Sequence, residues 1–126
     1  MAPEVPDFQG IEVDRVLGLR ELLAEAKRAM PWAWVGPSPE GAVVWRRADP
    51  IAFLWIEQGG GEGEYVGGAV VSRPRGLPNP ALRLRLRENP TRGTLILEGE
   101  GEEISELAKR LAQGVAQVLA GRKFWA

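Results

Sequence analysis

The sequence contains no histidine and no cysteine. These two residue types supply most of the general bases that work at neutral pH, the thiol nucleophiles and the soft metal ligands of proteins. Their absence excludes a Ser-His-Asp triad, a Cys-His dyad, a structural zinc site, an iron–sulfur cluster and a disulfide framework. Carboxylates, Lys, Arg, hydroxyls and one Tyr remain, and they form no catalytic motif that we can identify. The sequence therefore predicts a protein that is not an enzyme and needs no cofactor.

Long apolar runs are also absent. No run approaches the roughly 20 residues that a membrane-spanning helix requires, and the N-terminal sequence Met-Ala-Pro-Glu-Val-Pro lacks the basic and apolar regions of a signal peptide. The net charge of −1 indicates neither nucleic acid nor a membrane surface as a partner. We therefore expect a cytoplasmic protein with no membrane association. Its many Glu and Arg residues are compatible with a thermophilic source.

The 126 residues suffice for one domain with a substantial core. Residues 1–10 contain Pro3 and Pro6 and show no periodicity, so we expect a flexible N-terminal arm followed by a single α+β domain over 11–126.

Two segments have the apolar spacing of amphipathic helices. The first is 14–30, with Asp14 as the expected N-cap and Pro31 as the residue that ends it. The second is 102–120, with Gly121 just past its end. The apolar stripes are Leu19, Leu22, Leu23, Ala26 and Met30 in the first helix, and Ile104, Leu107, Ala108, Leu111, Val115, Val118 and Leu119 in the second. Gly114 interrupts the second helix, which suggests close packing against a strand.

Between the helices lie short β-type runs separated by Gly, Pro, Asn and Asp, at 32–35, 42–47, 51–57, 64–72, 82–87 and 94–98. The connections are short enough for hairpins. We therefore predict an antiparallel meander of five or six strands, with both helices packed on one face.

The other face of this sheet needs a partner. The run Ile51–Ile56 is apolar at odd and even positions alike, so both of its faces are predicted to be buried. Two helices of this length cover only one face. We expect the second face to pack against a copy of the chain in a homodimer, or against another protein; the alternative is a sheet that curls and buries both sides by itself.

Aromatic side chains concentrate on the same strands. Trp32, Trp34, Trp45 and Trp55, together with Phe53, are candidates for an interface or for a pocket that binds an apolar ligand. Core packing is the ordinary role of any one of them.

Leucine and arginine alternate over Leu82–Arg87, which predicts a strand with three Leu on the core side and Arg83, Arg85 and Arg87 together outside. Arg73, Arg75 and Arg92 flank this run. The six arginines are candidates for an anion site, including a nucleic-acid backbone. The alternative, which we favour, is a solvated strand whose charges prevent aggregation or pair with Glu98 or Glu57 on a neighbouring strand. No aromatic residue is interleaved for base stacking, which argues against nucleic acid.

The remaining polar segments have simpler interpretations. The glycines at 59–63 lack the Lys-Ser/Thr ending of a phosphate loop and indicate a hairpin loop. Gly67 and Gly68 indicate a bulge or a close approach of neighbouring groups. The acidic run over 98–106 matches the dipole of the second helix better than any metal-binding loop. Arg46, Arg47 and Asp49 are interpreted as a surface turn.

Three functions follow, in order of preference. The first is a non-enzymatic, adaptor-like or chaperone-like interaction module that acts as a homodimer. The second is an anion or nucleic-acid-backbone binder that uses the arginine-bearing strand. The third is a binder of small apolar ligands with a Trp-lined pocket.

Overall fold

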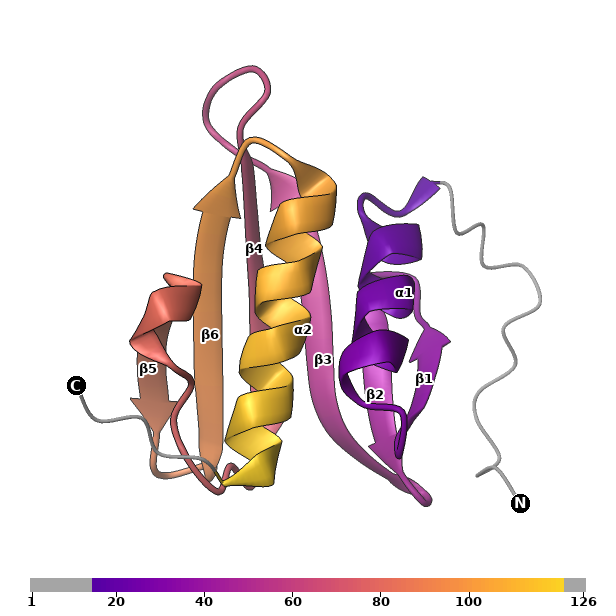
Figure 1. Ribbon diagram of the computed structural model, residues 1–126, viewed down its shortest axis with the longest axis vertical. Helices are drawn as coiled ribbons and strands as arrows, with labels where there is room; N and C mark the ends of the chain where they lie inside the picture. Colours follow the sequence, from indigo (N-terminus) through magenta and orange to yellow (C-terminus); the bar gives the residue numbers. More distant parts are fainter. Residues whose placement is uncertain (1–14, 122–126) are drawn as a thin grey trace.

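The computed structural model describes residues 15–121. The chain forms two α-helices and six strands around one sheet (Figure 1). In chain order these are α1 (Leu19–Ala29), β1 (Trp34–Pro37), β2 (Ala42–Arg46), β3 (Asp49–Gln58), β4 (Tyr65–Ser72), the short 3-10 helix η2 (Pro80–Leu82), β5 (Arg85–Asn89), β6 (Thr94–Gly101) and α2 (Ile104–Ala120).

All neighbouring strands are antiparallel, in the order β1-β2-β3-β4-β6-β5. The predicted antiparallel α+β sheet is therefore confirmed. The first four strands follow one another as in a meander, but the last two exchange places. After β4, the connection that contains η2 leads past the position of β6 to the edge strand β5. The chain then turns back and forms β6 between β4 and β5.

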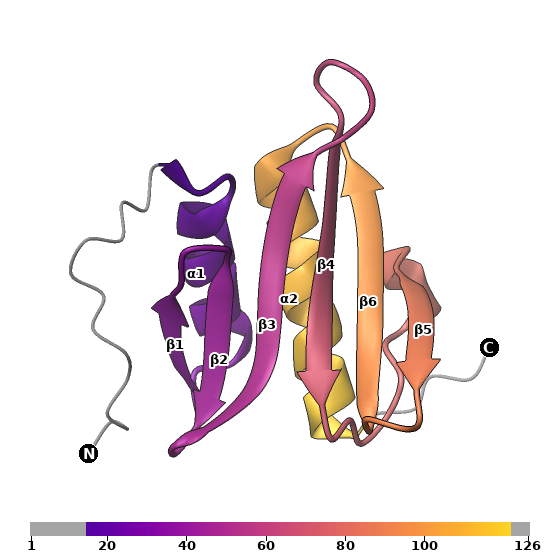
Figure 2. The same ribbon diagram turned by 180° about the vertical axis from the view of Figure 1, so that it is seen from behind.

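Both helices lie on the same face of the sheet, as predicted (Figures 1 and 2). The core between them holds the apolar stripes of both helices and one set of alternating strand residues, with Val44, Leu54, Val71 and Leu97 buried on four different strands. Burying an aliphatic side chain of this size contributes about 1.5–3 kcal/mol. The apolar core therefore lies between the two helices and the sheet.

The boundaries of the helices differ slightly from the prediction. Helix α1 begins at Leu19 because Gly18 has φ +70, a left-handed conformation that the right-handed helix cannot contain. Asp14 and the expected arm over 1–10 lie outside the described residues. Helix α2 ends at Gly121 with φ +75, as predicted. Among residues 15–121, no helix is long and apolar enough to cross a membrane.

Two glycine predictions are explained by close packing. A Cβ at Gly114 would lie 2.5 Å from Leu84 Cδ1 and 3.1 Å from Leu97 Cδ1, so the glycine lets α2 approach the sheet. A Cβ at Gly68 would lie 2.4 Å from the ring of Trp55. The register between β3 and β4 is continuous, so Gly67 and Gly68 mark a close approach and not a bulge.

Candidate functional site

The face of the sheet opposite the helices carries no described helix or strand (Figure 2). Paired residues of antiparallel strands point to the same side, so the register identifies its members. We call this surface the open face; its apolar residues, each partly exposed, are Trp34, Val43, Trp45, Phe53, Trp55, Val66, Val70 and Ile96.

Four of the five predicted aromatic residues lie on the open face. Trp34 is opposite Trp45 across β1 and β2. The rings of Phe53 and Trp55 are stacked with centroids 5.8 Å apart, and the ring of Trp55 lies over Gly68 of the next strand. The register therefore places these four aromatic side chains on one side of β1, β2 and β3, and the ring of Trp55 extends over β4.

Trp32 is the exception. It was predicted to share a face with Trp34, but β1 begins only at Trp34 and Trp32 lies in the turn before it. Its side chain is 54% exposed, and the Arg46 guanidinium lies over its ring at 5.7 Å from the centroid. It lies beside the turn between β2 and β3 and not on the open face.

The predicted stripe of three arginines is broken. Residues 82 and 83 are not in a strand: Leu82 ends η2, and Arg83 adopts φ +55 as its C-cap. The Asn79 side chain accepts a hydrogen bond from the Ala81 amide, which stabilises η2 where the Leu-Arg alternation predicted extended chain. Strand β5 starts at Arg85. Leu86 lies on the core side of β5 as predicted, opposite the buried Leu97, but it is 39% exposed.

Arg85 and Arg87 still share one side of β5, beside the open face. Arg85 is opposite Glu98, and Arg87 forms an ion pair with Glu98 on β6. This is the cross-strand pairing proposed from the sequence as the alternative to an anion site. An exposed pair of this kind contributes little to stability.

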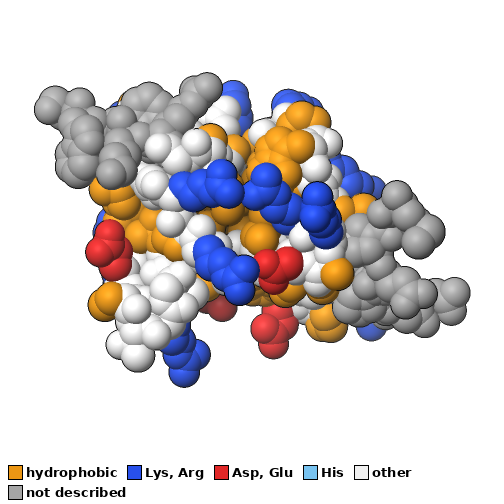
Figure 3. Space-filling model, turned by 90° about the horizontal axis from the view of Figure 1, so that it is seen from below, with side chains coloured by type: hydrophobic (Ala, Val, Ile, Leu, Met, Phe, Trp, Pro, Cys, Tyr) orange, Lys and Arg blue, Asp and Glu red, His pale blue; other side chains and the backbone are white. Residues whose placement is uncertain are grey.

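Basic side chains instead gather at the lower end of the molecule (Figure 3), where the β2–β3 turn, the start of the connection after β4 and the β5–β6 turn lie. We call this cluster the basic end: Arg46, Arg47, Arg73, Arg75 and Arg92. The cluster is held together by the fold, because the Arg73 amide donates to Gly93 O at 3.0 Å and the Arg75 amide donates to Val118 O at 3.2 Å. Asp49, 3.5 Å from Arg73, and Glu88 are the carboxylates beside it.

Half of the arginines predicted as an anion site are therefore brought together, in a place the sequence did not indicate. Arg73, Arg75 and Arg92 join the basic end, whereas Arg85 and Arg87 lie beside the open face and Arg83 lies elsewhere. Arg46 and Arg47, which the sequence analysis interpreted as an ordinary turn, complete the cluster. Their place in this cluster could be predicted only from the strand order, which decides which turns lie at the same end of the sheet.

Carboxylates gather at the opposite end, where the β3–β4 loop meets the start of α2. These residues are Glu57, Glu62, Glu64, Glu100, Glu102, Glu103 and Glu106, and we call them the acidic end. Strand β3 has ten residues and joins the two ends, which puts them about 30 Å apart at roughly 3.3 Å per residue. Carboxylates are thus in excess at one end of the strands and guanidinium groups at the other, although Arg83 and Arg110 lie beside the acidic end and Asp49 and Glu88 beside the basic end.

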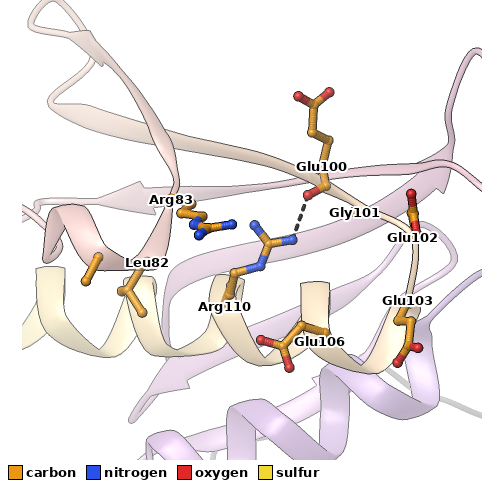
Figure 4. Close-up of a pocket in the computed structure, with 9 residues that line it drawn as sticks. Leu82, Arg83, Glu100, Gly101, Glu102, Glu103, Glu106 and Arg110 are labelled. Atoms are coloured by element: carbon orange, nitrogen blue, oxygen red, sulfur yellow. Dashed lines mark hydrogen bonds between the residues drawn. The ribbon is translucent and has the colours of Figure 1, made fainter.

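A cavity of about 710 Å³ lies between η2 and the start of α2 (Figure 4). Arg83 and Arg110 line it together with Glu100, Glu102 and Glu106. Arg110 donates to Glu100 O at 2.6 Å, so it holds β6 to α2. The glutamates stand beside the N-terminus of α2, where the helix dipole favours negative charge. Structural roles account for these residues.

Among the described residues, no group of three or more Asp and Glu is arranged to hold a metal ion. Comparison of the chain with protein-family models, curated proteins and solved structures gives no match.

Proposed function

We propose that the protein is a non-enzymatic interaction module that forms a homodimer through the open face. The observation that carries the proposal is the open face itself: eight partly exposed apolar side chains, four of them aromatic, on contiguous strands. Apolar patches of this extent on a soluble protein mark interaction surfaces. Large aromatic side chains are also the residues that contribute most to binding at interfaces.

The polarised charge supports a second copy of the chain as the partner. A two-fold axis perpendicular to the strands stacks two sheets face to face with their strands antiparallel. The acidic end of each copy then lies beside the basic end of the other, which is electrostatically favourable. An axis parallel to the strands would bring like ends together. We therefore propose the antiparallel arrangement, in which the same surface serves both partners.

The proposal is tested by a charge placed in the centre of the open face. Phe53→Glu adds a carboxylate that would be buried without a partner in the dimer, and such a group costs several kcal/mol. We expect sedimentation equilibrium to show a dimer for the natural chain and a dissociation constant raised at least about 100-fold for Phe53→Glu. Circular dichroism should show that the variant keeps its fold.

The matched control is Leu86→Glu, which places the same charge at an exposed apolar position on the side of the sheet that carries the helices. This variant should remain a dimer. Equal weakening by both variants would contradict the proposal, as would a monomeric natural chain.

A further inference from the structure

We infer that the basic end contains a binding site for a nucleotide, either free or as a unit of a single strand. The site is a cleft of about 420 Å³, within the size range of small-molecule pockets. Ile51 and residues of the last turns of α2 form its apolar wall, and Trp32, Arg46, Arg73 and Arg75 line its polar side. The inference does not depend on the proposed dimer, because none of the residues that line the cleft is an apolar residue of the open face.

The basic end carries more positive charge than its neighbouring carboxylates and the dipole of α2 neutralise. In the part of the chain that the structure describes, Arg47, Arg75 and Arg92 make no ion pair, and Arg73 has only the exposed Asp49 at 3.5 Å. The C-terminal end of α2 adds the equivalent of about half a negative charge. One arginine would offset it, and Arg75 is placed to do so. Several guanidinium groups remain, which is the arrangement that phosphate groups recognise.

The backbone of the cluster is strained. In residues 15–121, Arg47, Arg73 and Arg83 are the three residues other than glycine with positive φ, at +56, +55 and +55. Glycine or asparagine adopts this conformation at lower cost. Two of these three positions belong to the basic end. Strained residues that a fold retains are concentrated at functional sites, so the choice of arginine there indicates a role for its side chain.

The exposed tryptophan narrows the class of ligand. Trp32 lies beside the arginines with more than half of its side chain exposed, and Arg46 lies against its ring. A flat aromatic surface next to guanidinium groups suits a ligand with a planar ring and a phosphate, because the ring stacks and the phosphate pairs. The Ser72 hydroxyl and the Asp49 carboxylate line the same cleft and can accept hydrogen bonds from a sugar. An acidic peptide would use the arginines but leave the tryptophan without a role.

Isothermal titration calorimetry on the full chain tests the inference with four probes: adenosine diphosphate, a twelve-nucleotide single strand, inorganic tripolyphosphate and a polyglutamate peptide. We expect both nucleotide probes to bind more tightly than tripolyphosphate or polyglutamate. Equal affinity per site for the diphosphate and the strand identifies a free nucleotide as the ligand. Tighter binding of the strand, with a steep loss of affinity as salt is raised, identifies a single strand.

Three variants complete the test. Trp32→Ala should weaken the nucleotide probes at least about fivefold, the loss of one stacking contact, and leave tripolyphosphate unchanged. Arg73→Gly should weaken nucleotide and tripolyphosphate about tenfold, the loss of one charged hydrogen bond, without lowering thermal stability, because glycine relieves the positive φ. The matched control is Arg83→Gly, which removes the same charge at the same φ outside the cleft and should change no affinity.

Two results would overturn the inference. One is the absence of nucleotide binding by the folded natural chain. The other is binding of polyglutamate as tightly as of nucleotide with no effect of Trp32→Ala, which would make the basic end a general surface for acidic partners.

Discussion

Leu84 shows how single residues position the last two strands. Its two methyl groups occupy the space that glycine leaves on two elements: a Cβ at Gly114 would lie 2.5 Å from Cδ1, and a Cβ at Gly99 would lie 2.9 Å from Cδ2. The leucine side chain is therefore inserted between α2 and β6. The chain that leads into β5 is anchored by this contact.

This contact predicts that the effect of Gly114→Ala on the free energy of unfolding changes sign when Leu84 is replaced by Ala. In the natural chain, Gly114→Ala should lower the free energy of unfolding by about 1 kcal/mol, because overpacking costs roughly 1–3 kcal/mol and the gain in helix propensity is about 1 kcal/mol. In a Leu84→Ala background the same substitution should stabilise, because the space is then vacant. Urea unfolding of the four proteins measures both effects. Equal effects in the two backgrounds would show that Leu84 is not the obstacle.

The sequence predicted part of this detail. Gly114 stood out because it interrupts an otherwise apolar helix stripe, which correctly predicted close packing on the sheet. Its contacts with Leu84 and Leu97 could not be predicted, because they depend on which strands lie beneath α2. The positive φ of Arg47, Arg73 and Arg83 was also not predictable, since arginine is not a residue that prefers this conformation.

At the scale of elements, the connection from β4 to β5 is the least regular part of the fold. It is attached to α2 by two hydrogen bonds: the Asn79 amide donates to Gln117 Oε1 at 2.6 Å, and the Arg75 amide donates to Val118 O. This attachment holds the connection, together with one arginine of the basic end, against the last turns of α2.

Removal of the first of these bonds should loosen the connection and leave the rest of the sheet in place. Gln117→Ala removes the acceptor of a partly buried amide, at a cost of about 1 kcal/mol. We expect hydrogen exchange to accelerate roughly fivefold over residues 74–83 and to remain unchanged in β3 and β4. Gln113→Ala, one turn earlier on α2, is the matched control because its side chain makes no hydrogen bond with the described residues. Uniform acceleration over the whole sheet would contradict this account.

The elements themselves were largely predictable. Both helices, the six strand segments and their antiparallel pairing follow from apolar periodicity and turn residues. The order of the last two strands was not, because a connection of twelve residues is long enough to reach either side of β6. The predicted start of β5 was too early. Leu82 and Arg83 have the alternation of a strand, but the hydrogen bond from the Ala81 amide to the Asn79 side chain and the left-handed conformation of Arg83 favour η2 there.

At the scale of the whole molecule, two properties dominate: one apolar face that no described helix or strand covers, and an excess of opposite charges at the two ends of the strands. The first was predicted from the doubly apolar strand Ile51–Ile56 and the surrounding aromatic residues. The second was not, because a net charge of −1 conceals it and because the arginines of the basic end come from three turns distant in sequence. Only the antiparallel register brings those turns to one end.

The proposed dimer uses both properties, and the proposed nucleotide site uses only the basic end. The open face would hold a second copy of the chain, and the cleft beside α2 would hold a nucleotide. None of the residues that line the cleft is an apolar residue of the open face, so variants can test the two sites independently. The dimer is the central claim, because it accounts for the tryptophan and phenylalanine side chains on the face of the sheet that no described helix covers.

The most direct test is the molar mass of the natural chain, measured by multi-angle light scattering during gel filtration at micromolar concentration. Our account predicts a mass of about twice the 13.8 kDa of one chain. A mass that stays at 13.8 kDa as the protein is concentrated would contradict the account.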